Sequence, residues 1–288
     1  MGYRDYFDKK PTLGQNNNAL VLLFAINAFI FLSLIFLSLV YSLEYRAEAD
    51  VEFKKTILFW FELSSDYTVL LHKPWSIFVY AFSNISIIGF ISNMLWLWTF
   101  GYILQDLVGN KKLIPVYLYG SFFGGLIFLI ISSFQKEISD FLFLGSNTAI
   151  IAVAIATTTL SPKYKIFQHI GSGFSLWILA LIFIVFDISI IANSNLAVAG
   201  SHAIAGLVGF IFIYELKKGR DWSIWMYALV RSIENLFTPN NQKEKSNKKI
   251  KSETNEDGKL NNILDKINEK GYDGLSQSDK EYLESRGN

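Results

Sequence analysis

The chain contains no cysteine, and charged residues make up only 18% of its 288 positions. The absence of cysteine excludes disulfide bonds and thiol chemistry, and it leaves the redox compartment undefined. The few charges are unevenly placed, because long uncharged apolar segments are followed by a polar tail. A net charge of +1 supplies no excess of positive charge for a nucleic-acid partner, so we expect none.

Apolar and aromatic side chains are abundant, at 51% and 16% of the chain. A bilayer core about 30 Å thick requires about 20 apolar residues in a helix. Six segments fit this pattern: residues 20–43, 85–104, 113–133, 148–160, 174–191 and 196–216. The fourth is too short to cross alone, so we expect neighbouring helices to shelter it from lipid. The sequence therefore predicts an all-α polytopic membrane protein with six transmembrane helices in a bundle.

Lysine and arginine are concentrated in alternate loops. They precede the first segment, separate the second from the third, and follow the fourth and the sixth: Arg4, Lys9, Lys10, Lys111, Lys112, Lys163, Lys165, Lys217, Lys218 and Arg220. Basic loops stay in the cytoplasm, so both termini are predicted to be cytoplasmic and residues 44–73 to lie outside. Aromatic clusters at residues 59–61 and 74–75 suggest either a partly inserted hairpin or an aromatic belt.

Five parts follow from these patterns along the chain. Residues 1–19 are a cytoplasmic segment and residues 20–216 the transmembrane domain. Apolar residues at helical spacing predict an interfacial helix over residues 217–239. Residues 240–259 have the polar composition of a disordered linker, and periodicity returns in a small helical module at 260–288.

Three apolar segments contain polar residues in a distinctive order. Residues 93–101 read NMLWLWTFG, residues 144–150 read LGSNTAI, and residues 199–209 read AGSHAIAGLVG. Together they resemble the rhomboid family of intramembrane serine proteases over residues 74–216. The resemblance implies a helical bundle that cleaves transmembrane substrates with a Ser–His dyad from the fourth and sixth spans. The tail resembles that of some bacterial members, so we expect a protein of the bacterial inner membrane. We expect neither a cofactor nor a metal.

His202 is the candidate base. An ionisable side chain within a membrane segment is costly and indicates a functional site by default. The alternative is a structural histidine that is hydrogen-bonded to a neighbouring helix. The resemblance assigns His202 to the base position of the dyad.

Asn147 occupies the position where the family has its serine, and Thr148 replaces the glycine after it. An amide is a poor nucleophile, and Thr148 is expected to obstruct the approach of a substrate backbone. Ser146 and Thr148 point about 100° away from position 147 on a helix. Ser201 adjoins His202, but neighbouring helical residues do not face each other.

The oxyanion position is also incomplete. Asn93 matches the asparagine that the family has in the second span, but its partner one turn earlier is Gly89 instead of histidine. A further family histidine corresponds to Asn84 here. Loss of one oxyanion donor costs on the order of 10²–10³ in rate.

Two functions remain open. One is a pseudoprotease that binds transmembrane segments of client proteins within the bilayer. The other is an active protease with a non-standard nucleophile. A transporter lacks support, because the spans contain almost no charge beyond Asp187, which we expect to face the interface. We expect Asn147, His202 and Asn93 to cluster, with the Asn147 amide hydrogen-bonded to His202.

Overall fold

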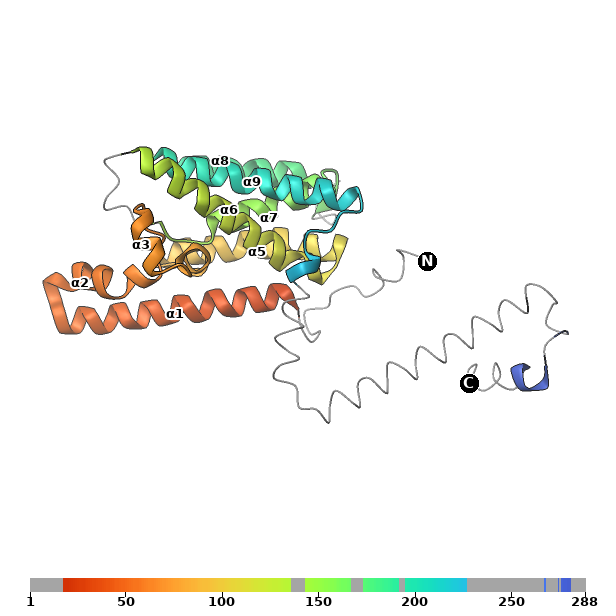
Figure 1. Ribbon diagram of the computed structural model, residues 1–288, viewed down its shortest axis with the longest axis horizontal. Coiled ribbons are helices and arrows are strands. Elements are labelled where there is room, and N and C mark those ends of the chain that lie inside the picture. Colours follow the sequence, from red (N-terminus) through yellow and green to blue (C-terminus); the bar gives the residue numbers. More distant parts are fainter. Residues whose placement is uncertain are drawn as a thin grey trace. The chain divides into compact units, whose positions relative to one another are not determined.

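The computed structural model describes residues 18–135, 143–166, 173–191 and 195–226, together with 267, 274 and 276–280. Six helices in this part of the chain correspond to the six predicted segments (Figure 1). They are α1 (Ala19–Tyr45), α5 (Ile87–Val108), α6 (Leu113–Phe134), α7 (Asn147–Leu160), α8 (Leu176–Ile191) and α9 (Leu196–Lys217). The predicted all-α helical bundle is confirmed.

Length separates these helices into two classes. Four stretches of the described residues are long and apolar enough to cross a membrane: Ala19–Trp60, Ile87–Val108, Asn110–Phe134 and Leu196–Lys217. α7 and α8 are apolar but shorter, at 14 and 16 residues. Since a spanning helix needs about 20 residues, α7 and α8 depend on their neighbours for burial of their ends.

Short elements connect the long helices. Between α1 and α5 lie η1 (Arg46–Glu48), α2 (Ala49–Thr56), η2 (Leu58–Trp60), α3 (Tyr67–His72), α4 (Ser76–Val79) and η3 (Tyr80–Phe82). η4 (Asn110–Lys112) precedes α6. β1 (Lys165–Ile166) and β2 (Phe174–Ser175) form a two-stranded antiparallel pair before α8. Residues 174 and 175 were predicted to be helical, but they pair with β1, so α8 begins at Leu176.

α7 is the most enclosed helix. It packs against α5, α6 and α9, and most of its side chains are buried. Small residues permit this close approach: a Cβ atom on Gly120 of α6 would overlap the side chain of Ala152 in α7. A Cβ atom on Gly124, one turn further along α6, would likewise overlap the side chain of Thr148. The expectation that neighbours shelter the short fourth segment is confirmed, and close helix packing through small residues provides the means.

α1 extends along one side of the bundle, and α2 folds back against its C-terminal part (Figure 1). Leu20 and Leu23 of α1 join the main core. Leu34 instead packs with Phe53 and Leu58 of the following loop in a second, smaller core. The loop after α1 is therefore a packed structure in its own right.

A buried lysine closes this loop. Lys73 is fully buried, and its ammonium group donates to the backbone oxygens of Phe59 and Glu62. Its Nζ atom also lies 3.6 Å from the Glu62 carboxylate and 4.0 Å from the centre of the Phe59 ring. Burial lowers the pKa of Lys73 and raises the pKa of Glu62, because both charges have lost water. Removal of one partner would leave the other charge buried and unpaired.

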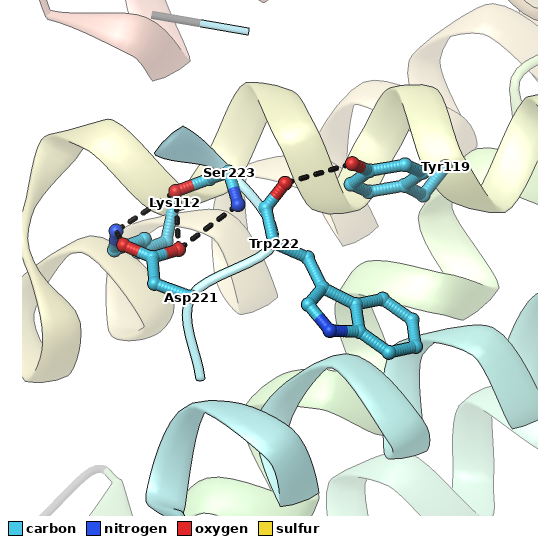
Figure 2. A network of polar contacts seen from close by, with 5 residues as sticks. All are labelled: Lys112, Tyr119, Asp221, Trp222 and Ser223. Carbon is cyan, nitrogen blue, oxygen red and sulfur yellow. Dashed lines mark hydrogen bonds and ion pairs between the residues drawn. The ribbon is translucent and has the colours of Figure 1, made fainter. Parts of the chain in front are cut away.

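The segment after α9 is anchored to the start of α6 (Figure 2). The Lys112 ammonium pairs with the Asp221 carboxylate and donates to Ser223 Oγ at 2.8 Å. The Tyr119 hydroxyl donates to the backbone oxygen of Trp222 at 2.8 Å. Burial raises the pKa of Asp221, but hydrogen bonds from Lys112 and Ser223 outweigh it and hold this pKa below its usual value. These contacts determine the direction in which the chain leaves α9.

Most of the predicted C-terminal parts lie outside the described residues. The chain divides into two compact units, residues 1–224 and 225–288. Residues 224–226 are helical, at the beginning of the predicted interfacial helix, and the rest of that helix is not among the described residues. The linker at 240–259 and the segment 1–17 also lie outside them. In the predicted module at 260–288, Ser276 Oγ accepts from the backbone N–H of Asp279 at 3.3 Å and caps one helical turn.

Candidate functional site

Asn147 is the first residue of α7, and the loop before it is held from two sides. The backbone N–H of Leu63 donates to the oxygen of Phe143 at 3.1 Å, and the N–H of Gly145 donates to the oxygen of Tyr80 at 3.0 Å. Gly145 has a φ of +116°, a conformation that favours glycine. The loop after α1 and the segment before α5 therefore position Asn147, whose side chain is half-buried.

A second asparagine, Asn84, links Asn93 to this loop. The Nδ2 atom of Asn93 donates to Oδ1 of Asn84 at 2.9 Å, and both side chains are buried. A Cβ atom on Gly145 would lie 3.7 Å from the same Asn84 oxygen. The Asn84–Asn93 pair thus borders the turn that leads to Asn147. The Nδ2 atom of Asn84 is buried and has no hydrogen-bond partner among the described residues, so it is an available donor.

Gly89 lies one helical turn before Asn93, so both positions share one face of α5. Its backbone N–H donates to the Oγ of Ser86, which caps the helix. A Cβ atom at this position would approach the Ser86 side chain only to 3.4 Å. Packing would therefore tolerate a side chain here, and glycine leaves this edge of the site without one.

His202 forms its hydrogen bond with Asp187. The Nδ1 atom lies 2.9 Å from Oδ2 of Asp187, and the two side chains are only 7% and 8% exposed. With Asp187 ionised, the Nδ1–H of His202 is the donor. Among the described residues no hydrogen bond joins His202 to Asn147, so the contact expected between these two is replaced by one with α8.

The expectation that Asp187 faces the membrane interface is wrong. Its neighbours on the same face of α8 are Leu176, Ala180 and Phe183, which are all buried. These positions are spaced at helical intervals, and they bring Asp187 onto the same inward-facing stripe. An ionisable residue within an apolar helix signals such an inward position, and the spacing of its apolar neighbours supports it.

Thr148 packs inward. It is 1% exposed, and its γ-methyl group occupies the space that faces Gly124 of α6. Ser201 of α9 meets the same glycine, because a Cβ atom there would lie 3.1 Å from Ser201 Oγ. Thr148 is therefore part of the contact among α6, α7 and α9. The expectation that it obstructs a substrate is not supported by this inward position.

No hydroxyl among the described residues is hydrogen-bonded to His202. Ser201 Oγ is buried without a partner. The Ser146 hydroxyl is buried beside the Tyr117 hydroxyl, but it forms no well-aligned hydrogen bond within the described structure. An activated serine requires a base within hydrogen-bond reach, and in the described structure neither Ser146 nor Ser201 is hydrogen-bonded to one.

The predicted residues thus fall into two groups of contacts. Asn93 and Asn84 border the turn before Asn147, whereas His202 is paired with Asp187 between α9 and α8. Sequence reasoning underestimated Asp187 and treated Asn84 only as a missing histidine. It stays a prediction that four residues act together in function: Asn147, His202, Asn93 and Gly89.

Comparison with known proteins identifies the fold that these contacts belong to. Residues 71–219 match the rhomboid domain, which is slightly more than half of the chain. No curated protein sequence matches the chain. The match extends from the segment before α4 to the end of α9, so it includes every residue of the candidate site. The chain belongs to the rhomboid family of intramembrane proteases.

Proposed function

We propose that this protein is a rhomboid pseudoprotease that binds transmembrane segments of client membrane proteins without cleaving them. The observation that carries the proposal is the absence of a hydroxyl group hydrogen-bonded to His202 in the described structure. The Nδ1 atom is hydrogen-bonded to Asp187, which leaves Nε2 available to a hydroxyl, yet no hydroxyl of the described residues is hydrogen-bonded to the ring. Together with asparagine at position 147, this arrangement supports a site that lacks a nucleophile.

The polar groups near Asn147 support a binding role. Asn84 Nδ2 is an unpartnered buried donor, and the Asn147 side chain is half-buried at the start of α7. A buried donor without a partner is costly in an apolar medium, so a client carbonyl group bound there would be stabilised. In this proposal both termini are in the cytoplasm of a bacterial cell, and the site lies towards the outer face of the inner membrane.

The second candidate is an active protease that uses Ser146 or Ser201 in place of residue 147. Only the presence of these hydroxyls favours it. Both are buried, and neither is bonded to His202. We therefore rank it below the pseudoprotease.

A fluorophosphonate probe and a fluorescent transmembrane substrate, both applied to the protein in proteoliposomes, separate the two functions. We expect no labelling and no cleavage above the level of Asn147→Ala. Energy transfer from a labelled transmembrane peptide to the protein should still report binding. Cleavage that disappears in His202→Ala would overturn the pseudoprotease proposal.

A further inference from the structure

The Asp187–His202 hydrogen bond is an isolated polar link. Among the described residues it is the only side-chain hydrogen bond between α8 and another helix. The rest of α8 contacts the bundle through apolar groups: Phe183 lies 5.0 Å from Trp96 and 5.6 Å from Phe100, measured between ring centres. Beyond Phe183, Asp187 is the next buried residue on this face.

α8 and α9 pack against different partners. α9 lies against α6 and α7, whereas α8 packs chiefly on α7. The Asp187–His202 contact therefore bridges two helices that share little other packing in the described structure. One partner of this hydrogen bond can be replaced while α6, α7 and α9 stay packed together.

The residues on either side of Asp187 face outward. Phe186 and Ile188 are 60% and 56% exposed, so the bundle leaves this side of α8 uncovered. Asp187 itself faces the bundle, so a transmembrane segment would reach its carboxylate only by entering between α8 and α9. Asp187 is four residues before the end of α8, which places it about 6 Å from that end along the helix axis.

A carboxylate at this depth must keep a hydrogen-bond donor. An unpaired ionised group in an apolar environment is strongly unfavourable, and His202 supplies the donor in the unbound protein. An apolar segment that displaced His202 would leave Asp187 unpaired. A segment with an amide, hydroxyl or ammonium group at the same depth would replace the lost donor.

We propose that Asp187 is a recognition residue for client segments that carry a hydrogen-bond donor side chain within the membrane. His202 keeps the carboxylate paired until such a client replaces it. This inference rests on the proposed function, because it names the class of client that the bundle selects. An interhelical hydrogen bond within a membrane contributes a modest free energy. One donor side chain should therefore increase the affinity for a client about three- to tenfold.

The absence of cysteine makes the test direct. A single fluorophore is attached at Leu207→Cys, a position on α9 that is 49% exposed, and the labelled protein is placed in lipid nanodiscs. Leucine–alanine peptides of about 21 residues, long enough to span the bilayer, carry either asparagine or leucine at the depth of Asp187. Energy transfer measures the dissociation constant of each peptide.

We expect the asparagine peptide to bind wild-type protein about three- to tenfold more tightly than the leucine peptide. Asp187→Leu should remove this preference by weakening only the asparagine peptide. Ser189→Ala is the matched control: Ser189 is exposed on the same helix and donates to its own Val185 oxygen, so the preference should persist. Unchanged affinity for the leucine peptide in Asp187→Leu shows that the variant is folded, and Asp187→Asn gives a second variant of the same shape.

The outcomes separate this inference from the proposed function. Equal binding of both peptides to the wild type, or a preference that survives Asp187→Leu, would overturn the role of Asp187 while client binding stands. Failure of every peptide to bind would overturn both.

Discussion

Gly209 of α9 packs directly on the backbone of Ala152 in α7. A Cβ atom at position 209 would overlap the carbonyl oxygen of Ala152 and lie 3.0 Å from its Cα atom. Backbone atoms of a buried helix cannot move aside without disturbing the neighbouring α6 contact at Gly120. Glycine at 209 is therefore a requirement of helix packing, and it needs no catalytic explanation.

Gly209→Ala should destabilise the protein by about 3 kcal/mol or more, because the added methyl group meets backbone. Gly206→Ala is the matched control on the same helix. Its Cβ atom would make ordinary contacts at 3.4 Å with Ile151 and Ile155, so its effect should stay within about 1 kcal/mol. Thermal unfolding in detergent measures both. Equal stability of the two variants would contradict the close packing.

The effects of breaking the Asp187–His202 pair from either side should not add. Asp187→Leu leaves the buried Nδ1–H without an acceptor, and His202→Phe leaves the carboxylate without its donor, so each change should cost about 1–3 kcal/mol. The double variant should be less destabilised than the sum, with a coupling of about 1–2 kcal/mol. Additive effects in the four-variant cycle would show that the two side chains do not interact.

Glu62 should make folding stability depend on pH. Because burial raises its pKa, its contribution is present below the ordinary value of 4.5 and is lost as pH rises through the raised value. Lys73 has a lowered pKa, so its contribution is lost as pH falls from 10.5 through the lowered value. We expect wild-type stability to decline relative to Glu62→Gln as pH increases from 4.5. Parallel curves of melting temperature against pH would contradict this.

Asn147→Ser alone should produce little or no proteolysis. It supplies a hydroxyl, but Gly89 leaves the oxyanion one donor short. Gly89→His in addition should increase fluorophosphonate labelling, since the position has room for a side chain. Robust cleavage by the single variant would show that the rest of the site is competent.

Thr148→Gly is not expected to assist this rescue. Its γ-methyl group fills the space against Gly124, so its removal should create a cavity and cost about 1–3 kcal/mol. Thr148→Val keeps the branched shape and should retain packing, which makes it the control. Melting temperatures of the two variants test this role, and an unaffected Thr148→Gly would refute it.

The anchor after α9 should depend on Lys112. Lys112→Met leaves Asp221 without its cation, so residues near 221 should become accessible to protease. Arg220→Ala is the control, because the Arg220 side chain is 63% exposed and its pair with Glu215 should contribute little. Limited proteolysis with mass spectrometry locates the cleavage sites. Equal protection in both variants would mean that the anchor does not depend on Lys112.

Several features of this protein follow from the sequence alone. Uncharged apolar runs predict helices wherever they are long enough, so all six appeared near their expected positions, and only residues 174–175 formed strand instead. The shortness of α7 predicted its enclosure, because a helix that cannot span the bilayer must be covered by protein. Asparagine at position 147 is a matter of residue identity, and no packing can supply a hydroxyl group there.

Tertiary structure decided which side chains meet. The sequence placed Asp187 near the end of a helix, but only packing of its stripe against the bundle made it the partner of His202. Likewise, Thr148 follows Asn147 in the sequence, yet it packs against Gly124 because α6 and α7 approach closely there. Helical periodicity determines which residues share a face, whereas the neighbour of that face depends on how separate helices pack together.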